Sequence, residues 1–344
     1  MGLDWQIVQW IMGCVSSYAF SILVNGSPSS FFRAGNGLRQ GCPLSPLLFL
    51  LVVDTLSRMI LRAKYEGNFC GFKVSVGSFI SHLFFMDEIF LLGSGSSGEW
   101  NYMKEILEVF CKASRLDING NKSCFFHVNI EDMPLSDIVS CWRITSSTLE
   151  NGIRYLGFFL KPTSYRAVVW HWLVNKFEKH IHFWANRWLS LGGRLMLVKV
   201  VLQNIQVYWS TLIKLPGSIK ARIKSFTTNF IWRGARSPLG FHLASWSIIA
   251  NPKHLGGWGI QDIDLFNKAL ATKSLWRALF HQDLWSMTVR RKYLKGLDVV
   301  SWLRKDVQKY NSASLVWRNL VTALPVVKRW AAWTIGSGKR VCLV

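Results

Sequence analysis

Paired cysteines are missing from this chain of 344 residues. Its seven cysteines form an odd number, and no two of them have the spacing of a CxxC motif. This pattern argues against a disulfide framework and against a zinc site, and it is typical of a reducing compartment. We therefore expect a cytoplasmic or nuclear protein rather than a secreted one.

Charged residues and low-complexity tracts are also scarce. Only 17% of the residues are charged whereas 50% are hydrophobic, and no internal repeat is evident. Such a composition argues against a disordered chain, and the length suffices for two domains.

Acidic residues are scarce in one part of the chain only. Residues 1–150 contain 11 Lys and Arg and 13 Asp and Glu, whereas residues 151–344 contain 30 and 6. A positive excess of this size attracts polyanions, with nucleic acid first and an anionic membrane second. Fourteen of the 18 tryptophans lie in the same part, from Trp170 onward. We expect most of them in the core and some of them to stack on bases.

Residues 5–24 carry no charge and resemble a membrane span in length. The segment contains Gln and Ser, however, and it follows Asp4 without a basic leader. Several apolar residues share one helical face, so we expect a buried amphipathic helix and no stable membrane insertion. These residues are Ile7, Ile11, Cys14, Val15 and Tyr18.

Two adjacent carboxylates, Asp87 and Glu88, interrupt the apolar run Leu83–Leu92. A charge inside such a run is costly unless it lies at a turn, is paired or holds a metal. We therefore predict a hairpin with Asp87 and Glu88 at its tip. Carboxylates on a rigid apolar base suit a Mg²⁺ site for phosphoryl transfer. The alternative is a hairpin whose exposed turn is acidic without having a function.

Turn and cap residues predict several further elements. Asn25-Gly26 predicts a hairpin turn, and Ser45 with Pro46 predicts the start of a helix that runs to about Ala63. Beyond residue 162 the spacing becomes helical. One helix there begins after Pro216 and is closed by Gly234. Its basic residues lie off the apolar stripe, namely Lys220, Arg222 and Lys224.

The order of these segments resembles the reverse transcriptase of LINE-type (non-LTR) retrotransposons, especially those of plants. The matching segments of the first part are VNGSPSSFFRAGNGLRQGCPLSPLLFLL, ISHLFFMDEIFLL, RLDINGNKS and RYLGFFL. Those of the second part include LSLGGRLMLVKVVLQNIQVYW and NPKHLGGWGIQDIDLFNKAL. The resemblance therefore covers nearly the whole chain.

The resemblance implies an α+β fold, a partial right-hand polymerase. Its palm and fingers, an antiparallel sheet with packed helices, would span residues 1–162. A basic helical thumb would span residues 163–280, and a helical connection before a zinc-binding segment would span residues 281–344. The partners implied are an RNA template and a DNA primer, and the cofactor is Mg²⁺ or Mn²⁺.

The resemblance also assigns roles to individual residues. Phe85-Met86-Asp87-Glu88 stands in the place of an F-A-D-D hairpin, which makes Asp87 the metal ligand and Glu88 its less critical catalytic neighbour. The residues implied to bind the nucleotide and the template are Arg39, Gln40, Gly41 and Lys122. The primer grip consists of Tyr155, Leu156 and Gly157. The residues implied to bind the nucleic-acid backbone are Lys220, Arg222 and Lys224.

Three departures from the family pattern predict an inactive remnant. The first catalytic Asp of the family lies upstream of the segment that matches residues 1–10, and neither Asp4 nor Asp54 takes its place. The acidic pair is Asp-Glu rather than Asp-Asp, and a misplacement of one methylene is costly for catalysis. Cys42 stands where the family usually has Asp.

Two other functions stay open at this point. One is RNA or DNA binding without catalysis, through the basic second part. The other is an interaction or membrane-surface protein, because incomplete fingers would leave apolar patches uncovered.

Overall fold

The computed structural model describes residues 2–33, 35, 37–75, 77–130, 132–156, 158–162, 165–184, 188–211, 213–234, 241–305 and 313–332. The chain divides into two compact units, Met1–Thr148 and Leu149–Val344, called the N-terminal unit and the C-terminal unit below. The domain boundaries that the sequence suggested, after residues 162 and 280, stay predictions.

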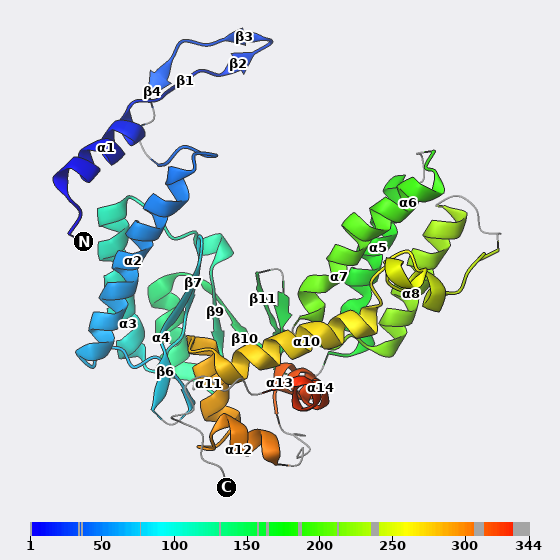
Figure 1. Cartoon of the computed structure of the whole chain (residues 1–344). Helices are drawn as coiled ribbons and strands as arrows, with labels where there is room; N and C mark the ends of the chain where they lie inside the picture. The colour runs from blue at the N-terminus through cyan, green and yellow to red at the C-terminus, as the bar shows by residue number, and fades with distance from the viewer. Residues whose placement is uncertain are drawn as a thin grey trace. The chain divides into compact units, whose positions relative to one another are not determined.

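The N-terminal unit mixes helices with short strands, as Figure 1 shows. Its helices are α1 (Trp5–Ser16), α2 (Leu44–Tyr65), α3 (Ser97–Ser114), η1 (Gly120–Lys122) and α4 (Asp132–Trp142). Its strands are β1 (Ala19–Phe20), β2 (Leu23–Val24), β3 (Ser27–Pro28), β4 (Phe32–Arg33), β5 (Phe72–Ser75), β6 (Ser78–Ile80), β7 (His82–Phe85), β8 (Glu88–Leu91), β9 (Cys124–His127) and β10 (Thr145–Thr148).

Most strand pairs of this unit are antiparallel hairpins, which confirms the predicted α+β class. The turn between β2 and β3 is Asn25-Gly26, with φ of 51° and 85°, the left-handed conformation that this dipeptide favours. One pair departs from the expected antiparallel sheet, because β9 and β10 run parallel. Parallel neighbours need a crossover connection, and α4 provides it.

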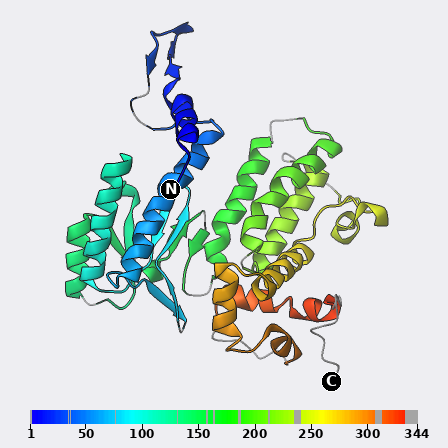
Figure 2. The same cartoon turned by 60° about the vertical axis from the view of Figure 1, so that its left-hand side comes forward.

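The core of the N-terminal unit lies between α2, α3 and the strands. Leu56 and Ile60 of α2 are fully buried, as is Met103 of α3. The Trp100 ring of α3 packs edge-on against Phe125 of β9, with 5.1 Å between the centroids. Figure 2 shows α2 and α3 side by side, as their contacts require.

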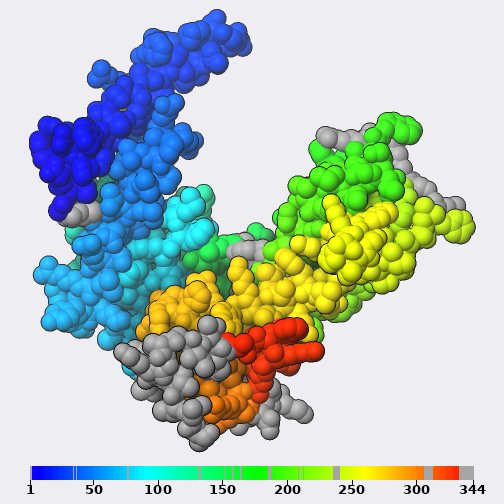
Figure 3. Space-filling view, viewed as in Figure 1, coloured from blue at the N-terminus to red at the C-terminus, as the bar shows by residue number. Residues whose placement is uncertain are grey.

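The expectation of a buried first helix was wrong. Asp4 caps α1 by accepting a hydrogen bond from the Gln6 backbone, but none of the residues of α1 is buried. Trp5 and Trp10 are 72% and 64% exposed. In Figure 3 the blue segment of α1 and the β1–β4 ribbon stands out from the rest of the unit. Amphipathic spacing predicts the helix, but it does not supply the surface that covers it.

Among the described residues, one helix is long and apolar enough to cross a membrane by length and composition alone, and this helix is α2. One face of α2 lies in the core of the N-terminal unit, where Leu56 and Ile60 are buried. A core helix passes the same test of length and composition.

The C-terminal unit is mainly helical. It begins with η2 (Leu149–Asn151) and the hairpin β11 (Ile153–Tyr155) and β12 (Phe158–Leu160). Its further helices are η3 (Ala167–Trp170), α5 (His171–Trp184), α6 (Leu191–Leu197), η4 (Val198–Leu202, a π-helix), α7 (Gln203–Ser210), α8 (Gly217–Arg233), α9 (Trp246–Ile249), η5 (Lys253–Leu255), α10 (Ile263–Phe280), α11 (Leu284–Tyr293), α12 (Val299–Arg304), α13 (Leu315–Val321) and α14 (Leu324–Trp330).

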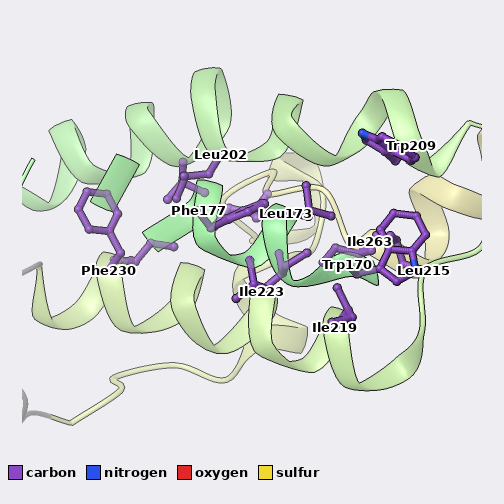
Figure 4. Packing of buried hydrophobic residues seen from close by; sticks show 14 of the residues in the cluster. Trp170, Leu173, Phe177, Leu202, Trp209, Leu215, Ile219, Ile223, Phe230 and Ile263 are labelled. Carbon is purple, nitrogen blue, oxygen red and sulfur yellow. The ribbon is translucent and has the colours of Figure 1, made fainter. Parts of the chain in front are cut away.

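Two tryptophan-rich clusters form the core of the C-terminal unit. Figure 4 shows the first, in which the Trp170 ring lies 5.4 Å from Trp209. In the second, Trp317 stacks on Tyr293 at 4.4 Å. Helix α10 contributes residues to both clusters, beginning with Ile263 in the first. These contacts confirm that many of the tryptophans serve packing.

Three carboxylates of this unit are N-caps of helices. Asp262, Asp283 and Asp298 cap α10, α11 and α12, and each side chain accepts backbone N–H groups of the first turn. Asp283 also accepts from the Arg277 guanidinium at 2.9 Å. The Ser286 backbone N–H, followed by Arg277, lowers the pKa of Asp283 from 3.8 to about 2.

Replacement of Leu173 by Ala tests the first cluster. Leu173 is fully buried among aromatic rings, so its truncation leaves a cavity and should lower the free energy of unfolding by about 2–5 kcal/mol. Val168→Ala, at a residue that is 70% exposed, is the matched control and should have little effect. Equal denaturation midpoints for the two variants would contradict this packing.

The cap at Asp283 predicts a pH dependence. Because its folded pKa is lowered to about 2, its contribution to stability is present above pH 4 and is lost as the pH falls toward 2. Asp283→Asn should therefore lower the melting temperature at pH 7, and the difference from the wild type should shrink between pH 4 and pH 2. Asp137→Asn, at an exposed residue of α4, is the control. A difference that does not change with pH would refute the cap.

Candidate active site

The acidic residues lie at the tip of the hairpin β7–β8, as the apolar run predicts. Phe85 pairs with Glu88, so Met86 and Asp87 form a two-residue turn. Met86 has a φ of 52°, the left-handed region that favours glycine. A side chain held there costs about 1–2 kcal/mol, and such strain is typical of functional turns. Whether the hairpin is functional or merely exposed stays a prediction.

The base of this hairpin is fixed to the core. Phe84 and Leu91 pack against the buried cluster of the N-terminal unit. Because side chains alternate along a strand, Glu88 lies on the opposite face together with its partner Phe85. The tip is thus exposed while its base is held.

His82 ties β7 to helix α2. Its Nε2 lies 2.9 Å from Ser57 Oγ, its Nδ1 lies 3.0 Å from Ser81 Oγ, and its ring lies 4.6 Å from the Phe84 ring. Burial, with a smaller effect from Lys64, lowers the pKa of His82 below 6.5. The neutral imidazole therefore joins the two serine hydroxyls and orients the strand that leads to Asp87.

The two carboxylates can supply some of the ligands of a divalent cation. Asp87 and Glu88 are exposed, and within the described ranges neither has an ion-pair partner. Mg²⁺ keeps several waters and is often bound by one or two carboxylates together with phosphate oxygens. Two adjacent carboxylates fit that partial role. The described residues contain no group of three His, Cys, Asp or Glu that could form a larger cluster.

The loop with Arg39, Gln40 and Gly41 lies directly before α2 and is exposed. Gly41 has a φ of 78°, which explains a glycine at this turn. The helix begins at Leu44, and Ser45 does not cap it as expected. Its hydroxyl instead donates to the Arg39 carbonyl at 2.8 Å and closes the loop.

A cavity of about 110 Å³ lies between this loop and α1. Arg39 and Cys42 line it from the loop, and Cys14 and Tyr18 line it from the end of α1. Backbone hydrogen bonding from Leu44 lowers the pKa of Cys42. The sequence assigns Arg39 to the template loop but gives no signal that α1 forms the other wall.

Lys122 ends the short helix η1 and is exposed, two residues before β9 begins at Cys124. The Asn119 side chain accepts a hydrogen bond from the backbone N–H of Lys122. The INGNKS segment therefore forms the predicted turn into a strand. Asp54 lies on the surface of α2 and pairs with Arg58 at 2.8 Å, as expected for a surface carboxylate.

The predicted primer-grip residues belong to the hairpin β11–β12 of the C-terminal unit. Tyr155 ends β11 and pairs with Phe158, and Leu156 has a φ of 48° in the turn. Gly157 lies outside the described residues.

The predicted backbone-binding residues of α8 all have partners inside the C-terminal unit. Lys220 pairs with Asp264, and Arg222 pairs with Glu178 at 3.5 Å. The Lys224 ammonium lies over the Trp246 ring, 5.5 Å from its centroid. These contacts connect α8 to α5, α9 and α10. Their role in binding nucleic acid stays a prediction.

The lowered pKa of His82 predicts that acid weakens the N-terminal unit. A group with a lowered folded pKa binds a proton more readily when unfolded, so stability falls as the pH drops below about 6.5. Melting curves between pH 8 and pH 5 should show this loss, and His82→Gln should flatten it. His127→Gln, on β9, is the control. An unchanged slope in His82→Gln would exclude this role.

Comparison with known proteins places these features in a family. The family model described as reverse transcriptase (RNA-dependent DNA polymerase) matches residues 3–160. An Arabidopsis thaliana protein named as a ribonuclease H protein is 31% identical over 172 residues, 49% of this chain and 27% of that relative. An uncharacterized mitochondrial protein of the same plant is 38% identical over 109 residues, 31% of this chain and 84% of that relative. This chain thus spans about a quarter of the first relative's length, and through residues 3–160 it belongs to the reverse transcriptase family.

Proposed function

We propose that this chain is the reverse transcriptase segment of a LINE-type retrotransposon protein, with weak or no DNA synthesis of its own. One observation carries the proposal. The β7–β8 hairpin holds Asp87 in a strained two-residue turn inside the segment that matches the family. Its substrates are an RNA template, a DNA primer and nucleoside triphosphates, in keeping with the family resemblance.

The roles of the residues follow the resemblance. Asp87 binds a hydrated Mg²⁺ or Mn²⁺, with Glu88 beside it. When bound, such an ion neutralises the phosphate charge that develops during phosphoryl transfer. Arg39, in the exposed loop before α2, contacts the template or the incoming nucleotide. Lys122, which is also exposed, places a positive charge near the phosphates of the incoming nucleotide.

Glu88 supports the proposal of weak catalysis. It stands where the family motif has a second Asp, and its carboxylate is one methylene farther from the backbone. A displacement of about 1 Å can reduce a rate by about a hundredfold. Glu88 begins β8 and pairs with Phe85, which fixes the register of its backbone in the hairpin.

A second candidate function is nucleic-acid binding without catalysis. The observation that favours it is that the acidic residues from residue 151 onward already have partners inside the unit. Every described Asp or Glu there either caps a helix or pairs with a cation of α8. The remaining cations of that region have few internal carboxylates to neutralise them, so phosphates are their natural partners.

The cellular location is also a proposal. The six cysteines of the described residues are all free thiols. This supports a reducing compartment, the cytoplasm or the nucleus, where nucleic acid is present.

Primer extension on an RNA template tests the catalytic proposal. With Mg²⁺ or Mn²⁺, the full chain should show weak DNA synthesis at most, because the Glu88 carboxylate lies one methylene farther from the backbone than the Asp of the family motif. Glu88→Asp restores the spacing of the family motif and should raise any synthesis. Asp137→Asn is the control for an exposed carboxylate outside the hairpin. Synthesis in the wild type that is as strong as in Glu88→Asp, and that Asp87→Ala abolishes, would overturn the proposed loss of activity.

The same variants separate the second function from the first. Binding of a labelled RNA–DNA hybrid, followed by fluorescence anisotropy, should weaken steeply as salt rises and should survive Asp87→Ala. If the wild type binds no nucleic acid at low salt, both functions are excluded.

A further inference from the structure

Helix α10 carries an apolar stripe on the face turned away from its core. The buried face holds Asn267, Ala271 and Leu275. On the other side, residues recur at spacings of four and three, which places them in one row along the helix. This outer row consists of Leu265, Ala269, Thr272, Trp276 and Phe280. In Figure 3 part of the gold α10 segment lies open on the face in view.

The outer row ends in a pair of aromatic rings. Trp276 is 44% exposed and Phe280 is 40% exposed. Their centroids are 4.3 Å apart, with 40° between the ring planes, so they form one aromatic surface. Leu265, at the other end of the row, is 71% exposed. An exposed aromatic pair in line with a further exposed apolar side chain is typical of a binding surface.

The flanks of the row are positively charged. Lys268 and Lys273 lie on either side of it and are exposed. Within the parts of the chain that the structure describes, neither ammonium has a salt-bridge partner. Asp264, one turn before Lys268, pairs with Lys220. Cations beside an aromatic surface are the combination that binds single-stranded nucleic acid, where bases stack and phosphates meet lysines.

The charges also argue against other occupants. A second copy of α10 packed on the row would bring Lys268 and Lys273 of both copies together, and like charges at such a seam are unfavourable. A membrane surface favours a longer apolar face, whereas Ala269 and Thr272 make the middle of this row small and partly polar.

We propose that the outer face of α10 is a stacking platform for an unpaired nucleic-acid strand. Bases stack on Trp276 and Phe280, and Lys268 and Lys273 hold the flanking phosphates. This site lies beyond residues 3–160, which match the family, and its lysines are not those of α8, which have partners of their own. The inference rests on the proposed action on nucleic acid.

Binding of a short fluorescein-labelled single-stranded oligonucleotide to the full chain tests the platform. Trp276→Leu keeps an apolar side chain at this position but removes the stacking ring, so affinity should fall about tenfold, while Trp276→Phe retains most of it. The matched control is Phe241→Ala, which removes an aromatic ring that is 93% exposed in the same unit and should change nothing. Melting temperatures check that each variant is folded.

The lysines give an independent readout. Lys268→Gln combined with Lys273→Gln should reduce the slope of log affinity against log salt by about 1.4, the value for two phosphate contacts on a single strand. A matched RNA–DNA hybrid should bind Trp276→Leu as well as it binds the wild type, because paired bases are not free to stack on the rings.

Several outcomes would overturn the platform. One is equal oligonucleotide affinity in Trp276→Leu and the wild type while the hybrid still binds, which leaves the proposed function intact. Another is an equal loss for oligonucleotide and hybrid. A third is binding to phosphatidylserine vesicles that Trp276→Leu abolishes while the oligonucleotide affinity is unchanged. If the wild type binds neither nucleic acid, the platform and the proposed function fail together.

Discussion

The scarcity of carboxylates after residue 150 is the constraint on which the structure and its proposed function depend. The described carboxylates of that region begin helices, as Asp283 does, or neutralise a cation of α8, as Glu178 does. Each of these contacts stabilises the C-terminal unit. Residues 151–344 contain only 6 Asp and Glu for 30 Lys and Arg, which gives the unit a field that attracts phosphate. In the N-terminal unit, Asp87 and Glu88 are exposed at a hairpin tip, and neither has an ion-pair partner among the described residues.

That hairpin is built to hold its tip in place. Phe84 and Leu91 anchor it in the core, and the neutral His82 ties it to α2 through Ser57. The left-handed Met86 then carries the strain of a two-residue turn. Such support suits the proposed cation site, because its carboxylates must keep their place while a nucleotide binds and leaves.

The sequence predicted those parts of the fold that depend on neighbouring residues. The Asn25-Gly26 turn, the helix after Pro216 and the acidic hairpin all follow from local turn chemistry and alternation. The predictions from the sequence failed where contacts between distant segments determine burial or strand pairing. Helix α1 has the amphipathic spacing of a buried helix but no partner surface within the described residues, and β10 pairs in parallel because α4 crosses over. The contacts of Lys220 with Asp264 and of Arg222 with Glu178 join segments far apart in the chain, so no local pattern announces them. The positions of Asp87 and Glu88 were predicted, whereas the strain at Met86 became visible only in the structure.

The central claim is that the tip of this hairpin binds a divalent cation. Met86 lies next to Asp87 and is 67% exposed, so its methyl group reports on that site. In protein labelled with ¹³C at the methionine methyl groups, titration with Mn²⁺ in the presence of a primer–template should broaden the Met86 signal first. The signal of Met133, which is 79% exposed on α4, should broaden only at higher Mn²⁺. Broadening of both signals at the same Mn²⁺ concentration, or a Met86 signal that stays sharp, would contradict the claim.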